Sequence, residues 1–139
     1  MIIGSMETEL VAGLIIRDRR LLLVRNAKYS VERIEPPGGK VEAGETREGA
    51  LVREVTEETG LTVQSQSYFG AYKTDSPEGT FTVYTYLCVV AGGEPEVREP
   101  EKTPEVGWYT IEELEELSRG TELAPNMKAA MGKIIELLG

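Results

Sequence analysis

Three glutamates, Glu54, Glu57 and Glu58, have the residue type and the spacing to bind a metal ion. On a helix that turns about 100° per residue they fall within an arc of about 100°, so their carboxylates share one face. Like charges at these spacings repel by roughly 0.2–0.5 kcal/mol per pair on an exposed helix. Because Mg²⁺ and Mn²⁺ prefer oxygen ligands, the pattern indicates a divalent-metal site, with a solvated acidic helix as the alternative.

The residues around these carboxylates fit the same interpretation. Ala50 lies one turn before Glu54 and leaves room above the carboxylates. The neighbouring arc, which we expect to face the core, holds Leu51, Val52 and Val55. Ahead of the helix, Gly38 and Gly39 allow the backbone to approach a ligand closely, and a loop carbonyl there could point at the same cation.

The carboxylate helix is expected over residues 46–59, with Thr46 as its N-cap and Gly60 just past its end. Residues 36–39, Pro-Pro-Gly-Gly, predict a turn before it. Alternating and apolar runs predict strands over residues 10–17, 21–24, 61–74, 80–91 and 106–109, with further helices over 111–117 and 124–138. The strand over 80–91 has bulky groups on both faces and is expected inside the sheet. This order predicts an α+β fold with a mixed sheet.

Composition excludes several classes of function. The 139 residues contain 24 acids against 15 bases, a net charge of −9, which argues against binding to polymeric nucleic acid. The chain has no histidine and one cysteine, Cys88, which excludes His-dependent triads, His-ligated zinc and internal disulfides. No apolar run approaches about 18 residues, so we expect no membrane span and a cytoplasmic protein. We interpret residues 1–6, MIIGSM, as a vector remnant or a disordered N-terminus, followed by a single domain over residues 7–139.

The glutamates belong to a longer pattern that begins at Gly39 and ends at Leu61. Gly39 is followed after five residues by Glu45, and after seven more by the run REVTEETGL, which starts at Arg53. This matches every fixed position of GX5EX7REUXEEXGU, in which U is a bulky apolar residue and which defines the Nudix box. The chain therefore resembles the Nudix hydrolases, and the expected strands and helices around the box are similar to theirs.

The resemblance implies an α/β/α sandwich and hydrolysis of a nucleoside diphosphate linked to another group, X. It implies that Glu54, Glu57 and Glu58 bind Mg²⁺, or Mn²⁺ in its place. It further implies that the carbonyl of Gly38 completes the metal shell, and that Arg53 acts in the catalytic set by orienting the glutamates. Supporting positions of the box are Gly39, Glu45 and Gly60.

A water molecule that attacks a phosphate needs a group to accept its proton, and a carboxylate can do so. We expect Glu54 to take this role. Members of the family differ in which carboxylate acts as the base, and loop acids outside the box also serve. Among the acids before Trp108, Glu101 is our candidate, with a solvated loop acid as the alternative.

The resemblance implies a small nucleotide as substrate, whose identity would be decided by residues outside the box. The resemblance to MutT-type members predicts a nucleoside triphosphate or its oxidised form, such as 8-oxo-dGTP. There Asn126 would read a purine edge, unless it is a local helix cap, and Tyr29 is a candidate stacking residue. ADP-ribose or a nucleotide sugar is the competing prediction, for which the position of Pro77 is a weak cue. A non-catalytic nucleotide sensor, an interaction domain and a homodimer are also compatible with the sequence.

Overall fold

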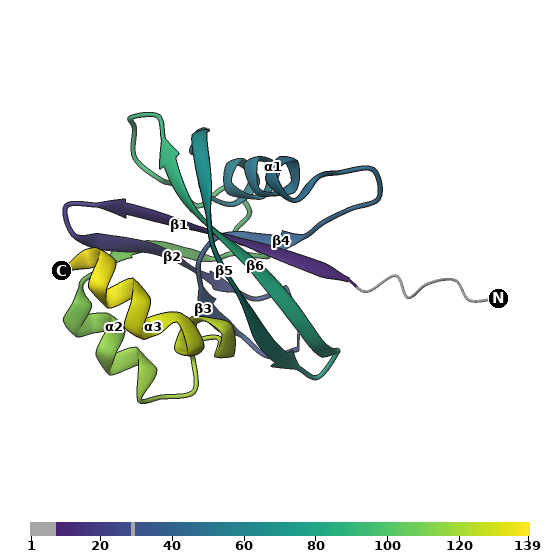
Figure 1. Cartoon of the computed structure of the whole chain (residues 1–139). Helices are drawn as coiled ribbons and strands as arrows, with labels where there is room; N and C mark the ends of the chain where they lie inside the picture. Colours follow the sequence, from purple (N-terminus) through teal and green to yellow (C-terminus); the bar gives the residue numbers. More distant parts are fainter. Residues whose placement is uncertain (1–7, 29) are drawn as a thin grey trace.

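The computed structural model describes residues 8–28 and 30–139 (Figure 1). Its strands are β1 (Glu9–Arg17), β2 (Arg20–Asn26), β3 (Arg33–Glu35), β4 (Gly38–Lys40), β5 (Val63–Ser76), β6 (Gly79–Val90) and β7 (Glu105–Tyr109). Its helices are α1 (Arg47–Thr59), α2 (Ile111–Ser118) and α3 (Pro125–Leu138). The strands form a seven-stranded sheet in the order β3-β2-β1-β6-β5, in which β4 pairs with β1 and β7 with β2. The β1–β6 pair is parallel and the other pairs are antiparallel, so the predicted mixed sheet is confirmed.

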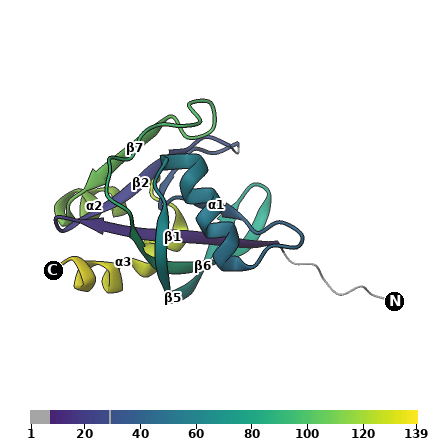
Figure 2. The same ribbon diagram turned by 90° about the horizontal axis from the view of Figure 1, so that it is seen from above.

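The sheet lies between two helical layers, with α1 on one side and α2 with α3 on the other (Figures 1 and 2). Alternate residues of strand β2 pack toward the two helical layers. Leu21 and Leu23 pack in the core beneath α2 and α3, whereas Leu22 packs in the core beneath α1. This alternation follows from the two-residue period of a strand. The predicted α+β architecture is therefore confirmed.

Helix α1 begins and ends where the sequence predicts. The Thr46 hydroxyl accepts a hydrogen bond of 2.9 Å from the Gly49 amide, and Gly60 ends the helix at φ 77°. Gly13 in β1 favours the close approach of α1 to the sheet, because a Cβ there would lie 3.2 Å from Leu51 Cδ1 and would crowd it. These features fix the height and the rotation of α1 over the sheet.

Two expectations about this region are wrong. Val52 was expected in the core and is exposed, because it lies about 100° beyond Leu51, outside the buried strip of α1. The turn predicted over residues 36–39 is confined to its prolines. Gly38 and Gly39 belong to β4, where they pair with Ala12 and Val11 of β1. Backbone pairing needs no side chain, so two glycines can continue a sheet that their residue types disfavour.

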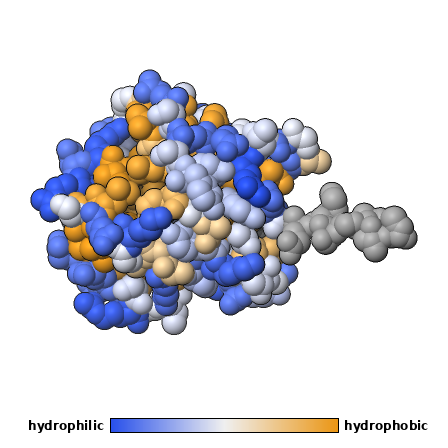
Figure 3. Space-filling view, in the orientation of Figure 1, coloured by the Kyte–Doolittle hydropathy of each residue, from blue (hydrophilic) through white to orange (hydrophobic). Residues whose placement is uncertain are grey.

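The other strands largely follow the prediction. Strand β6 lies inside the sheet between β1 and β5, as its bulky faces indicated. Trp108 of β7 packs against the core beneath α1, and the Arg17 guanidinium lies 5.1 Å from its ring centre. On the face shown in Figure 3, apolar residues gather around α3 and the neighbouring strands, bordered by hydrophilic ones. Within the described parts of the chain, no helix is long and apolar enough to cross a membrane.

Candidate active site

Helix α1 brings Glu54 and Glu58 beneath β4, in the middle of its buried strip. Their exposed fractions are 8% and 1%. The Lys28 ammonium lies between them, with Nζ 3.1 Å from Glu58 Oε2 and 3.6 Å from Glu54 Oε2. The Gly38 amide donates to Glu58 Oε1 at 3.3 Å. Two buried carboxylates thus converge on a single positive charge.

The electrostatics of Glu58 follow from this burial. Burial raises the pKa of Glu58 well above its ordinary value, because a buried carboxylate loses hydration, and the adjacent Glu54 carboxylate raises it further. The Lys28 ammonium opposes both effects. A cation between the two carboxylates therefore favours the charged form of Glu58, against the effect of burial.

Arg53 organises the outer side of the site. Its guanidinium donates to both oxygens of Glu45, at 2.7 and 2.9 Å, and to Glu54 Oε1 at 2.7 Å. It also donates to the Lys40 carbonyl at 3.1 Å and to Glu57 Oε1 at 3.1 Å. A planar guanidinium suits this bidentate geometry. Arg53 therefore fixes one oxygen of Glu54 and ties α1 to the loop before it.

The pKa of Glu45 is lowered to about 2, mainly by its hydrogen bonds from Arg53. Because this is below its ordinary value of 4.5, the charged carboxylate stabilises the folded state above about pH 4.5, and that contribution is lost as the pH falls toward 2. We expect Glu45→Gln to unfold at lower urea concentration than the wild type at pH 7. The difference between the urea concentrations at which the two proteins unfold should narrow as the pH falls below 4.5.

Urea unfolding of both proteins between pH 3 and 7 measures this effect. Glu94→Gln is the matched control, since Glu94 is an exposed acid whose ion pair with Arg17 is 3.6 Å long. A gap between Glu45→Gln and the wild type that stays constant with pH would contradict the role given to the Glu45 charge.

Glu57 is separated from the other two box glutamates. Its side chain is 44% exposed and turns toward Arg53. Among residues 8–28 and 30–139, no three acidic, Cys or His side chains gather closely enough to enclose a metal ion. The pair Glu54 and Glu58 nevertheless fits a hard cation, because its donors are carboxylate oxygens and an ammonium group already stands between them.

The two glycines of β4 leave no room for side chains against this pair. A Cβ at Gly39 would overlap the Glu54 carboxylate, and one at Gly38 would overlap the Val11 carbonyl oxygen. The backbone of β4 thus lies directly against β1 and the Glu54 carboxylate, and its expected approach to a ligand stays a prediction. Gly38 contacts the site through its amide, while the sequence prediction concerned its carbonyl.

Glu101 lies exposed in the loop between β6 and β7. That loop is fixed near the site, because the Lys102 carbonyl accepts a 2.8 Å hydrogen bond from the amide of Ala27, the residue before Lys28. Of the other acids near Trp108, Glu105 lies in β7 and pairs with Arg25 at 3.2 Å. Glu101 thus stays a candidate carboxylate, on a loop that is bonded to the segment before Lys28.

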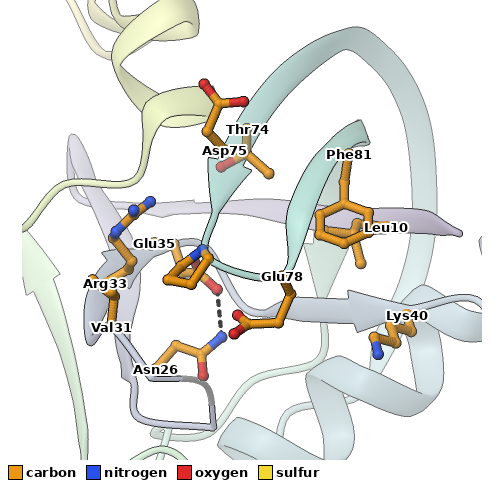
Figure 4. Close-up of a pocket in the computed structure, with 11 residues that line it drawn as sticks. Leu10, Asn26, Val31, Arg33, Glu35, Lys40, Thr74, Asp75, Glu78 and Phe81 are labelled. Atoms are coloured by element: carbon orange, nitrogen blue, oxygen red, sulfur yellow. Dashed lines mark hydrogen bonds between the residues drawn. The ribbon is translucent and has the colours of Figure 1, made fainter.

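A pocket opens between β1, residues of the β2–β3 region and the β5–β6 hairpin (Figure 4). Figure 4 shows Asn26, Glu35 and Glu78 turned toward one another, and the Asn26 amide donates to Glu35 at 2.7 Å. The apolar part of the lining is Leu10, Val31, Pro77 and Phe81. Burial raises the pKa of Glu35, against the lowering effects of Asn26, Lys28 and Arg33.

The pocket and the carboxylates are joined by a polar chain. Glu35 accepts from Asn26, whose Oδ1 accepts the Lys28 amide at 2.9 Å, and the Lys28 ammonium reaches Glu58. Sequence reasoning missed Lys28, Asn26 and Glu35. The only sequence signal was the position of Glu35, three residues before Gly38.

Asn126 is buried and lines a smaller adjoining cavity, together with Glu35, Pro36 and Thr74. The alternative of a helix cap is wrong, because Ala124 occupies the N-cap position of α3 and no side chain caps it. Tyr29 lies outside the described residues. Asn126 thus adjoins the pocket through Glu35, which lines both cavities.

Comparisons with known proteins agree with this geometry. The profile described as NUDIX domain matches residues 7–138. A Mycobacterium tuberculosis protein named "Putative 8-oxo-dGTP diphosphatase 2" is 36% identical over 110 residues, covering 77% of this chain and 76% of that protein. An "ADP-ribose pyrophosphatase" of Methanocaldococcus jannaschii is 36% identical over 98 residues, covering 68% and 58%. The crystal structure of a MutT NUDIX hydrolase from Burkholderia pseudomallei has a TM-score of 0.79 at 24% identity, covering 92% of this chain and 98% of that one, which shows the shared fold.

Proposed function

This chain belongs to the NUDIX domain family and is a Nudix hydrolase, and from that premise we propose that it is a divalent-metal-dependent pyrophosphohydrolase of nucleoside triphosphates. Its substrates would be (d)NTPs or oxidised forms such as 8-oxo-dGTP, and its products a nucleoside monophosphate and pyrophosphate. The observation that carries the proposal is the polar chain from Glu35 through Asn26 and Lys28 to Glu58. It joins a pocket that would take the base to the carboxylates that would act on the phosphates.

The chemistry assigned to the site uses few residues. Glu54 and Glu58 would hold Mg²⁺ or Mn²⁺, which when bound offsets the charge of phosphate oxygens and lowers the pKa of a bound water. Glu54 is our candidate to accept the proton of the attacking water, and Arg53 holds one of its oxygens in place. Glu57, at the exposed edge, would complete the carboxylate set, and Glu101 is the candidate outside the box.

The pocket suits a base with one polar edge. Its apolar lining can contact the face of a ring, whereas Asn26, Glu35 and the nearby Asn126 offer both donors and acceptors for the edge. The name of the Mycobacterium tuberculosis relative supports an oxidised guanine. ADP-ribose is the second candidate, supported by the name of the Methanocaldococcus jannaschii relative and by Pro77, which lines the pocket.

The test is a turnover screen with Mg²⁺ and with Mn²⁺. The panel holds 8-oxo-dGTP, dGTP, the other (d)NTPs, ADP-ribose and a nucleotide sugar, and products are separated by chromatography. We expect a nucleoside monophosphate and pyrophosphate from a triphosphate, and no turnover in EDTA. Preferred cleavage of ADP-ribose would overturn the choice of substrate, and binding without turnover of any nucleotide would overturn the hydrolase proposal.

Asn126→Ala should weaken discrimination between 8-oxo-dGTP and dGTP by roughly tenfold, through kcat/KM. The reason is that an amide which donates and accepts at a base edge is replaced by a group that does neither. Asn26→Ala is measured beside it, because the Asn26 amide also lines the pocket and donates to Glu35. Unchanged discrimination in a folded Asn126→Ala protein would remove Asn126 from base recognition.

A further inference from the structure

Lys28 has a fixed backbone and a side chain that reaches into the carboxylate site. Its amide donates to Asn26 Oδ1 at 2.9 Å, and the amide of the preceding Ala27 donates to the Lys102 carbonyl at 2.8 Å. The Lys28 side chain is only 19% exposed. Four flexible carbons separate this anchored backbone from the ammonium group, so the charge can move while the loop stays in place.

The position of the ammonium group is the decisive observation. Nζ lies 3.1 Å from Glu58 Oε2 and 3.6 Å from Glu54 Oε2, so one ammonium group contacts both carboxylates. Glu54 and Glu58 would hold a divalent ion through the carboxylates that Lys28 already contacts. The ion and the ammonium would then compete for the same oxygens, and two positive charges at such close range repel.

We propose that Lys28 is a resident cation of the carboxylate site, whose ammonium group a divalent metal must displace in order to bind Glu54 and Glu58. The inference rests on the proposed function in one respect, namely that the metal binds to these two glutamates. In the metal-free protein, Lys28 offsets the repulsion between two buried carboxylates. The same contact makes metal binding weaker than the carboxylates alone would allow. Lys28 thus sets the metal affinity of the site.

The experiment measures metal binding without any nucleotide. Wild type and Lys28→Met, both freed of metal with EDTA and dialysed, are titrated with MnCl₂ and with MgCl₂ in a calorimeter. Thermal unfolding is followed in EDTA and in each metal. We expect Lys28→Met to bind metal about tenfold more tightly than the wild type, and to unfold about 5 °C or more below it in EDTA. Saturating metal should close most of that gap.

Two further variants separate position from charge. Lys73→Met also removes one positive charge, but from an exposed side chain that donates to Thr82, and it should bind metal like the wild type. Lys28→Gln keeps a donor for Glu58 without the charge, so it should also bind metal more tightly. It keeps the proposal testable if Lys28→Met fails to fold in EDTA.

The outcomes are distinct. Wild-type metal affinity in both Lys28 variants would overturn the proposal while leaving the metal-dependent hydrolase intact. An equal gain in Lys73→Met would overturn it too, because the effect would then come from overall charge. Absence of metal binding in every protein, including the Lys28 variants, would overturn both the inference and the metal dependence of the proposed function.

Discussion

Glu54→Gln should lower nucleotide hydrolysis by roughly 10²–10⁴-fold, the range usually lost with a positioned proton acceptor. The Glu54 carboxylate stands between Arg53 and Lys28, and the Gly39 backbone lies directly against it. An amide of the same shape can still accept from Arg53, so the fold should persist. It can neither take up a proton at neutral pH nor supply the negative charge that a metal requires. The measurement is pyrophosphate release at saturating metal and nucleotide.

A matched control comes from the same helix. Glu48 accepts a hydrogen bond from the Tyr86 hydroxyl at 3.1 Å, outside the carboxylate pair, so Glu48→Gln should keep activity within about twofold. Calorimetry with Mn²⁺ then separates the two roles given to Glu54. Lost turnover with metal binding retained identifies the proton acceptor, whereas loss of both identifies a ligand. Full activity in Glu54→Gln would contradict both roles and make Glu101→Gln the next variant.

Helix α1 could be predicted from the sequence because its signals are local. A threonine that can cap, an apolar strip with the helical period and a glycine that tolerates φ 77° all act within a few residues. The spacing of the box placed its glutamates on one side of this helix for the same reason. The bulky groups on both faces of β6 also predicted its interior position, since such a strand is best buried where layers cover both faces of the sheet.

The rest of the site depends on long-range packing, which spacing does not encode. Leu51 and Val55 of α1 pack over Gly13 of β1, and this contact sets the rotation of the helix about its own axis. The rotation buries Glu58 but leaves Glu57 exposed. Lys28 reaches Glu58 across 30 positions of sequence. Nothing near Lys28 in the sequence distinguishes it from a solvated lysine, so its role emerges only once the β2–β3 loop is folded over α1.

The same substitution at the two glycines of β4 should impair different properties, stability at Gly38 and hydrolysis at Gly39. A Cβ at Gly38 would overlap the Val11 carbonyl oxygen and lie 2.9 Å from Ala12 Cα, both in the backbone of an interior strand. Such a strand cannot shift without disturbing its pairing with β6. We therefore expect Gly38→Ala to lower the free energy of unfolding by about 1–3 kcal/mol, or more, in urea denaturation.

At Gly39 the atoms in the way belong to the end of a flexible side chain. The new Cβ would overlap the Glu54 carboxylate, whose carbon lies 2.6 Å from that position, and a rotation of Glu54 can relieve the overlap. Gly39→Ala should therefore cost less stability than Gly38→Ala, but it should lower hydrolysis by roughly 10²-fold, the effect of misplacing a catalytic group by about 1 Å. Gly132→Ala in α3, where a Cβ meets open space, is the control for adding a methyl group. Wild-type hydrolysis in Gly39→Ala would contradict this expectation. A methyl group against the Glu54 carboxylate would then have no effect on the reaction, so the β4 backbone would not hold that carboxylate in its catalytic position.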